Sequence, residues 1–99
     1  MAVKVLIKRR FKEGFFKEID NMIKKVRYGA MDQQGYISSE TLWDHEDPFR
    51  VVIASTWRTI EDWKRWQYSE ERRKNEDDFE YFLDGTTHFE VFDLGMYPH

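Results

Sequence analysis

One apolar segment sets the architecture of this chain: Val51-Val52-Ile53-Ala54-Ser55-Thr56-Trp57. Neighbouring residues of a strand point to opposite faces of the sheet, so the first half of this run has apolar side chains on both faces. Pro48 lacks the N–H that a ladder hydrogen bond needs, which places the start of the strand after it. Residues 49–57 therefore predict a strand that must be covered on both sides.

Three further segments have the period-two alternation of strands. Val3, Val5 and Ile7 alternate with more polar neighbours near the N-terminus. Residues 36–43 follow a Gln-Gln-Gly turn, and residues 87–94 follow an Asp-Gly turn. Simple alternation in the second strand places Tyr36, Ser38 and Leu42 on one face and Ile37, Thr41 and Trp43 on the other.

Two helical regions separate these strands. Apolar residues at helical spacing run from Phe15 to Ala30 and predict one long helix. Thr59 is a favourable N-cap, and the acidic residues after it suit the positive end of a helix. Ser69 repeats this start signal and predicts a second short helix to residue 78. Residues 79–83 fit neither pattern clearly.

The order of these elements is βαββαβ, the ferredoxin-like topology of the α+β class, with an antiparallel sheet over a single domain, residues 1–99. This topology places the first and third strands at the centre, which agrees with the apolar third strand. Its helices cover only one face of the sheet. We expect a second sheet, from another copy of the chain, to cover the other face, which predicts a homodimer.

Composition narrows the function classes. Eight Phe, five Tyr and four Trp in 99 residues are more aromatic area than a small core hides, which indicates a pocket or an interface. A net charge of −3 disfavours nucleic acid. The third strand also lacks the Gly-aromatic pattern of RNA-binding βαββαβ domains. Cysteine is absent, and no leader or membrane span is apparent, so a cytoplasmic location without membrane contact is expected.

Four segments carry a family resemblance that extends over nearly the whole chain. They are Gly35-Tyr36-Ile37, the run that ends at Trp57, Ile60-Glu61-Asp62-Trp63-Lys64-Arg65-Trp66 with Ser69-Glu70, and Val91-Phe92-Asp93-Leu94-Gly95. A strand-ending Trp, a helix with two Trp and a Ser-Glu pair make an uncommon string. The chain resembles the antibiotic biosynthesis monooxygenase family, whose members form dimeric α+β barrels.

The resemblance implies several chemistries, because the family includes cofactor-free oxygenases of aromatic polyketide-like substrates, haem-degrading enzymes and handlers of small aldehydes or ketoses. In the haem-degrading branch, a first-strand Asn, a Trp at the end of the third strand and a helical His form the site. Trp57 matches that Trp, but the first-strand position is Ile7 or a neighbouring Lys, and residues 70–78 contain no His. No cofactor or metal is expected; haem is an alternative that these residues do not support.

Trp57 and His88 are the catalytic candidates. Trp57 could form the wall of a pocket between sheet and helices, or be a core Trp whose indole N–H has a partner. His88 could shuttle a proton near neutral pH, or be a surface or interfacial residue. The candidates for substrate binding are Tyr36, Trp63, Trp66, Tyr68 and Asn75. Packing onto the sheet is the simpler interpretation of the two helical Trp residues.

Charged clusters have less specific interpretations. His45 and its acidic neighbours superficially offer metal ligands, but a solvated turn is the expected outcome. Lys8-Arg9-Arg10 and Arg72-Arg73-Lys74 could attract an anionic substrate. Acids such as Glu76 balance the second cluster, so solvated faces are expected for both.

Two functions remain open. One is a small monooxygenase, cofactor-free, that binds an aromatic or quinol-like molecule between sheet and helices and lets the deprotonated substrate reduce O₂. The other is a non-catalytic module that binds an apolar or aromatic small molecule, or only dimerises. The sequence contains no Ser-His-Asp spacing, phosphate loop or carboxylate pair that would indicate another reaction.

Overall fold

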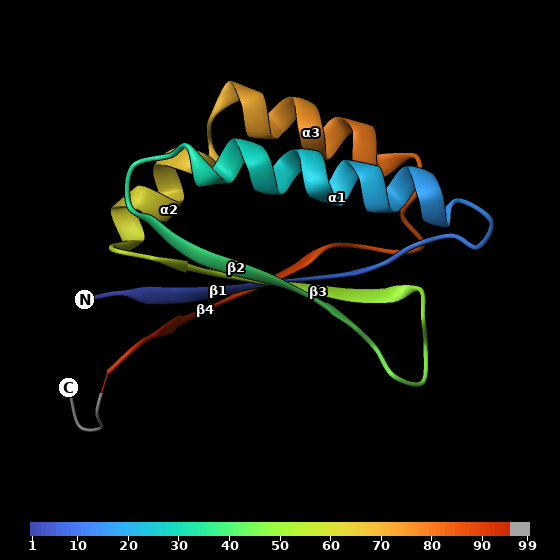
Figure 1. Cartoon of the computed structure of the whole chain (residues 1–99), viewed down its shortest axis with the longest axis horizontal. Coiled ribbons are helices and arrows are strands. Elements are labelled where there is room, and N and C mark those ends of the chain that lie inside the picture. The colour runs from blue at the N-terminus through green and yellow to red at the C-terminus, as the bar shows by residue number, and fades with distance from the viewer. Residues whose placement is uncertain (96–99) are drawn as a thin grey trace.

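The structure, a computed structural model, describes residues 1–95 and has the predicted βαββαβ order (Figure 1). The elements are β1 Val3–Arg10, α1 Phe16–Met31, β2 Tyr36–Trp43, β3 Arg50–Trp57, α2 Ile60–Gln67, α3 Glu70–Glu80 and β4 His88–Asp93. The strands form one antiparallel sheet in the order β2-β3-β1-β4. The ferredoxin-like fold and the central position of the first and third strands are confirmed.

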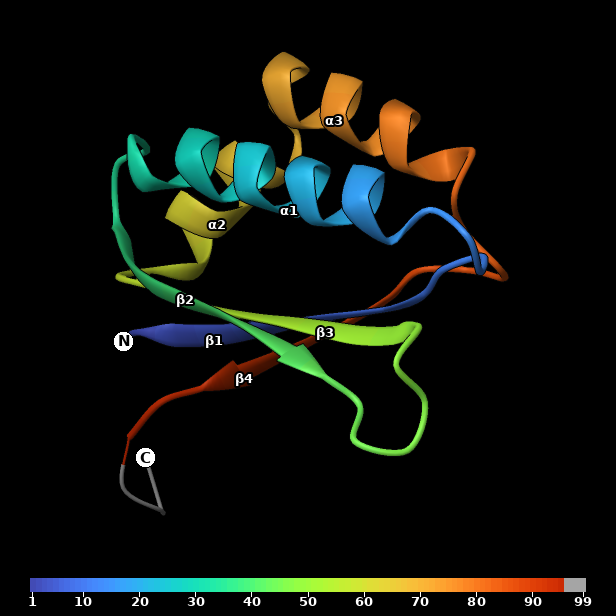
Figure 2. The same cartoon turned by 45° about the vertical axis from the view of Figure 1, so that its right-hand side comes forward.

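All three helices lie on one face of the sheet, and no described segment of the chain covers the other face (Figures 1 and 2). α1 and α3 run side by side above the strands, and α2 packs near the end of the sheet where β3 stops. On β1, Val3, Val5, Ile7 and Arg9 are buried under the helices, while the residues between them are only half-buried. A region between sheet and helices is therefore the sheltered part of the protomer.

Both predicted helix starts are confirmed. The Thr59 hydroxyl accepts a hydrogen bond from the N–H of Asp62 at 3.1 Å and caps α2. The Ser69 hydroxyl accepts one from the N–H of Arg72 at 3.2 Å and caps α3. Each cap satisfies a backbone donor that has no partner within its own helix, which fixes where the helix begins. α3 extends beyond residue 78 to Glu80, so Phe79 belongs to the helix.

β2 contains a bulge that changes the predicted assignment of its faces. Tyr36 is opposite Trp57, but Ser38 is opposite Thr56, so the pairing shifts between Tyr36 and Ser38. A bulge adds one residue on one strand and reverses the alternation beyond it. Tyr36 consequently shares the helix-covered face with Ser39, and its predicted grouping with Ser38 and Leu42 on one face is wrong.

The buried apolar side chains form two clusters under the helices. One surrounds Trp57 and contains Val5, Trp63 and Trp66; the other surrounds Phe11 and Phe79. The half-buried Ile53 packs against both clusters, so they meet at the middle of β3. The candidate site lies at this junction.

Candidate functional site

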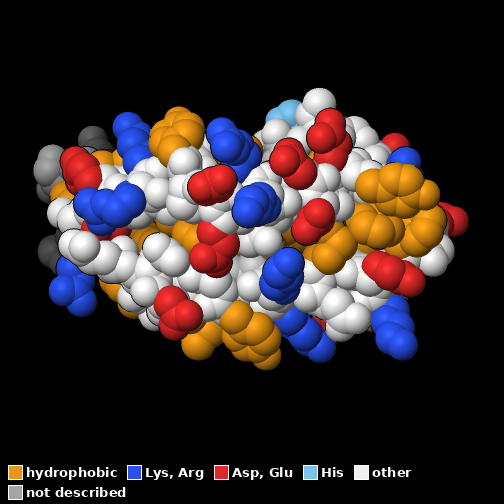
Figure 3. Space-filling model, turned by 90° about the horizontal axis from the view of Figure 1, so that it is seen from above, with side chains coloured by type: hydrophobic (Ala, Val, Ile, Leu, Met, Phe, Trp, Pro, Cys, Tyr) orange, Lys and Arg blue, Asp and Glu red, His pale blue; other side chains and the backbone are white. Residues whose placement is uncertain are grey.

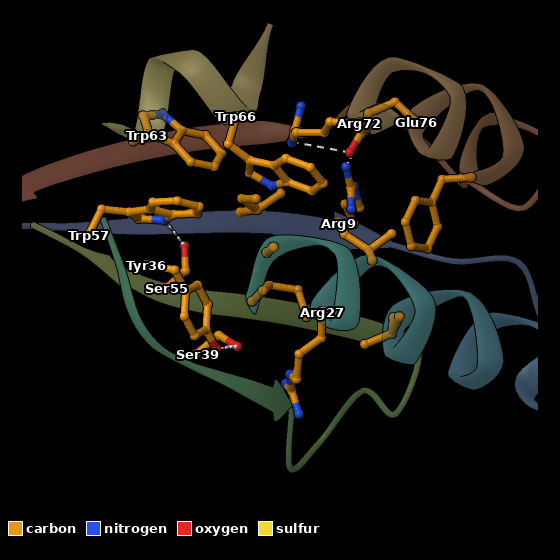
Figure 4. Close-up of a pocket in the computed structure, with 16 residues that line it drawn as sticks. Arg9, Arg27, Tyr36, Ser39, Ser55, Trp57, Trp63, Trp66, Arg72 and Glu76 are labelled. Carbon is orange, nitrogen blue, oxygen red and sulfur yellow. Dashed lines mark hydrogen bonds and ion pairs between the residues drawn. The ribbon is translucent and has the colours of Figure 1, made fainter. Parts of the chain in front are cut away.

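A cavity of about 40 Å³ lies between the sheet and the helices, bounded by side chains from β1, β2, β3 and all three helices (Figure 4). A water molecule needs roughly 10–15 Å³ of such space, so the cavity has room for about three waters. One end is aromatic and the other is charged. The lining residues used below are Arg9, Arg27, Tyr36, Ser39, Ser55, Trp57, Trp63, Trp66, Arg72 and Glu76.

Trp57 forms the aromatic end. Its side chain is completely buried, and its indole Nε1 donates a hydrogen bond to Ser55 Oγ at 3.0 Å. The ring of Tyr36 stands almost perpendicular to it, with ring centroids 5.6 Å apart at an interplanar angle of 88°. The ring of Trp63 covers it from α2 at 5.8 Å. Three aromatic rings from three elements thus hold one another in fixed positions.

Two hydroxyl groups extend this wall along the edge strand. The Tyr36 hydroxyl lies 2.7 Å from Ser39 Oγ, in a pairing that the bulge in β2 makes possible. Ser55, on the neighbouring β3, is opposite Ser39 and holds the Trp57 indole. Hydroxyls both donate and accept hydrogen bonds, so this side of the cavity could orient a polar group of a ligand.

The charged end is made by Arg9, Arg72 and Glu76. Both guanidinium groups belong to residues only 5% exposed, although Arg9 is on β1 and Arg72 is on α3. Arg9 forms an ion pair with Glu76, and its Nε donates a hydrogen bond to Thr87 Oγ1 at 3.2 Å. Nη2 of Arg72 lies 3.1 Å from Glu76 Oε1. Two buried cations therefore share one carboxylate (Figure 4).

Aromatic rings also hold the two guanidinium groups. The Arg9 guanidinium carbon lies 4.6 Å from the ring centre of Phe79, and that of Arg72 lies 5.2 Å from Trp63 and 5.4 Å from Phe89. Burial lowers the pKa of the Arg72 guanidinium from its ordinary value, the charge of Glu76 opposes this, and Arg9 adds to it. An arginine still stays protonated in proteins, so both groups are cations at neutral pH.

The solvated-face prediction is wrong for Arg9 and Arg72. The outer surface of the helices has the expected mixture of acidic and basic side chains (Figure 3). Arg9, however, lies on the same face of β1 as the buried Val3, Val5 and Ile7. Its place in this alternation is the feature of the sequence that indicates its burial. Arg72 follows the Ser69 cap by three residues, but the sequence does not show that this side of α3 meets β1.

The structure brings together some of the predicted site residues. Tyr36, Trp57, Trp63 and Trp66 all line the cavity. Tyr68 is 77% exposed at the end of α2 and lies outside it, and Asn75 is buried on α3 without being a lining residue.

His88 lies on the sheet face away from the helices. Its neighbour Phe89 contacts Trp63 under the helices, so His88 points the opposite way, and its Nε2 is 3.2 Å from Thr86 Oγ1. The structure does not bring His88 and Trp57 together within one protomer.

Two of the acidic side chains around His45, those of Asp44 and Asp47, have partners of their own. Asp44 accepts hydrogen bonds from the N–H groups of Asp47 and Glu46, and these bonds, with Arg50, lower the pKa of its carboxyl. Asp47 accepts a hydrogen bond from Arg10 at 2.8 Å. Within residues 1–95, no group of three or more His, Cys, Asp or Glu is arranged to hold a metal ion.

The family model described as antibiotic biosynthesis monooxygenase matches residues 2–88. The chain belongs to this family. No curated protein matches the sequence. The match to the family spans every residue that lines the cavity described above.

Several solved structures share the fold of this chain at low sequence identity. A putative antibiotic biosynthesis monooxygenase from Nitrosomonas europaea has 13% identity and a TM-score of 0.87, covering 98% of this chain and 92% of that one. SnoaB, a cofactor-independent oxygenase from Streptomyces nogalater, has 12% identity and a TM-score of 0.85, with 99% and 98% covered. A conserved protein from Methanosarcina mazei Go1 has 17% identity and a TM-score of 0.87, with 93% and 91% covered.

The helices of this family member are short or amphipathic. In the part of the chain that the structure describes, none of them is long and apolar enough to cross a membrane.

Proposed function

We propose that this protein is a small cofactor-free oxygenase that acts on an aromatic or quinol-like molecule in the cavity beside Trp57. The observation that carries the proposal is the buried aromatic wall, in which the Trp57 indole is fixed by Ser55 and faced by Tyr36 and Trp63. Flat rings pack favourably against such walls. Membership of a monooxygenase family and the likeness to a cofactor-independent oxygenase support this choice.

The reaction needs only substrate and O₂. A CH₂ group between electron-rich rings loses a proton to water, and the resulting carbanion gives one electron to O₂. A C–O bond then forms, the peroxide anion takes back one proton from water and eliminates H₂O, and the CH₂ becomes a carbonyl: R₂CH₂ + O₂ gives R₂C=O + H₂O. The chain contributes by holding the ring against Trp57, by excluding bulk water and by stabilising the negative charge of the carbanion.

Substrate entry requires side chains to move. The cavity of about 40 Å³ is far below the roughly 300–1,000 Å³ of typical ligand pockets. Arg27 on α1 lines it next to β2 and donates a hydrogen bond to Thr41 there. Because β2 is an edge strand, we propose that the substrate enters between α1 and β2, past Arg27.

Oxygen uptake with anthrone-type and quinol substrates tests the proposal. Trp57→Phe removes the indole N–H and part of the wall, and we expect kcat/KM to fall about tenfold or more, since a misplaced substrate reacts poorly. Trp43→Phe is the matched control, because Trp43 is 37% exposed and does not line the cavity. Uptake no faster than in buffer for all these substrates would refute the oxygenase function.

The alternative function is a non-catalytic module that only binds a small molecule or dimerises. It is favoured by one observation: Glu76 is the only carboxylate among the described residues that line the cavity, and it is already shared by Arg9 and Arg72. No free base is thus available there to deprotonate a substrate. Native mass spectrometry would then detect a bound aromatic ligand that stays unchanged in air.

We also propose that two copies associate through the bare face of the sheet and that the protein is cytoplasmic. Leu42 on β2 and Phe92 on β4 are 47% and 51% exposed on this face. Exposed apolar side chains on a sheet gain stability when a second sheet covers them. We propose no nucleic-acid partner, because acidic residues outnumber basic ones.

A further inference from the structure

We propose that the cavity is specific for an aromatic ligand that carries a carboxylate, with Arg72 as the group that binds it. This inference rests on the cavity being the ligand site of the proposed function, but it does not depend on turnover. Its basis is an excess of buried positive charge at one end of an aromatic cavity (Figure 4).

The charged side chains of the cavity do not balance. Among residues 1–95, the buried Arg9 and Arg72 and the half-buried Arg27 line it, and Glu76 is the only acidic residue that does so. Glu76 is paired with Arg9 and Arg72 together, while Arg27 donates to the neutral hydroxyl of Thr41. A buried charge without a counter-charge is costly, because the protein interior solvates it poorly. An anionic ligand would remove this cost.

Arg72 has a donor to spare. Its Nη2 is buried and 3.1 Å from Glu76 Oε1, but the two atoms form no hydrogen bond with each other. Among the described residues, neither atom has another hydrogen-bond partner. The Arg72 side chain is 6% exposed, so bulk solvent does not reach it, and any water held in the cavity would have to leave when a ligand binds. A guanidinium with an unused N–H in such an enclosed site is suited to a carboxylate oxygen.

The distribution of groups also fits one ligand. Trp63 stacks beneath the Arg72 guanidinium and also packs against Trp57, so it joins the charged end to the aromatic wall. A ring that lies against Trp57 would therefore extend its substituent toward Arg72. Lys74, on the same helix, is exposed and cannot serve a buried ligand.

Calorimetric titration with benzoate and with its neutral, isosteric amide, benzamide, tests this inference. We expect the native protein to bind benzoate about tenfold or more tightly than benzamide, as a charge-assisted hydrogen bond in a site closed to bulk solvent implies. Arg72→Met keeps an unbranched apolar stem but removes the guanidinium, and it should reduce the ratio of the two affinities to about one. Arg72→Lys, which restores the charge, should recover part of it.

Glu76→Gln separates a binding role from a structural one. Removing the carboxylate increases the excess of positive charge, so benzoate should bind more tightly than to the native protein, although the protein itself becomes less stable. Arg73→Met is the matched control, since Arg73 is exposed one residue along the same helix, and its affinity ratio should stay native. Circular dichroism checks that each variant is folded.

The inference is overturned if the native protein binds the two probes equally or neither at millimolar concentration, if Arg72→Met retains the preference, or if Glu76→Gln weakens benzoate binding. Oxygen uptake with neutral quinols is measured separately. It tests the oxygenase function whatever the outcome of the titrations, so the two failures can be told apart.

Discussion

Gly35 holds the turn between α1 and β2 against the start of α2. Its backbone has φ of +84°, and a Cβ built on it would lie 2.1 Å from Asp62 Oδ2 and 2.5 Å from Asp62 Cβ. Its carbonyl oxygen also accepts a hydrogen bond from the N–H of Arg58 at 2.7 Å. Any residue with a side chain would therefore be strained in its backbone at this position, and its Cβ would overlap Asp62.

Gly35→Ala should destabilise the protein more than the same change at Gly14. Gly14 has φ of +94° but nothing within 4 Å of a built Cβ, so Gly14→Ala incurs only the backbone strain, about 1 kcal/mol. At Gly35 the overlap with Asp62 adds about 1–3 kcal/mol. Urea unfolding measures both, and equal losses at the two glycines would contradict the predicted close contact.

At the scale of single elements, α2 depends on a capped and charged first turn. The Asp62 carboxylate accepts a hydrogen bond from the Thr59 hydroxyl at 2.9 Å and one from Arg65 at 2.9 Å. These two hydrogen bonds, that of Thr59 first, lower the pKa of Asp62 below its ordinary value of 3.8. A carboxyl with a depressed folded-state pKa stabilises the fold above its unfolded pKa and loses that contribution as the pH falls through the folded value.

Asp62→Asn should therefore make the free energy of unfolding depend less on pH in the acidic range. The native protein loses stability as the pH falls below about 3.8, because Asp62 takes up a proton less readily when folded than when unfolded. The variant lacks that proton uptake, so its stability should depend less on pH in this range. Glu61→Gln, exposed in the same turn, is the control. Identical slopes of unfolding free energy against pH for Asp62→Asn and the native protein would contradict the expectation.

The elements differ in how much of them the sequence could predict. Local signals fixed the starts of α2 and α3, because a hydroxyl cap and the helix it begins are adjacent in the chain. The bulge in β2 is a property of its pairing with β3, and alternation within β2 does not encode it. The contact of Arg9 with Glu76 joins residues 67 positions apart, so no local pattern could reveal it. Trp57 and its aromatic neighbours were predictable from burial and family resemblance. At the charged end, alternation on β1 indicates the burial of Arg9, but nothing in the sequence indicates that it meets Glu76 and Arg72.

For the molecule as a whole, the asymmetry of the sheet is the main feature. Its helix-covered face has a packed core, whereas the other face has half-buried Leu6 and Val52 at the centre and exposed apolar side chains at the edges. Two ion pairs, Lys4 with Glu40 and Lys8 with Glu90, join strands of the sheet. Such a face is apolar enough to associate and polar enough to fix the orientation of a partner sheet.

Phe92→Glu should convert the proposed homodimer into a monomer. Phe92 is 51% exposed, so the change hardly alters the protomer, but it places a charge where a second sheet would have to bury it, at a cost of several kcal/mol. Tyr68→Glu is the matched control, because Tyr68 is 77% exposed on the helix side, and that variant should still dimerise. Sedimentation velocity over a hundredfold range of concentration distinguishes the two species. A native protein that sediments as a monomer throughout would show that the bare face of the sheet does not bind a second copy, and the cavity would then have to function within a single chain.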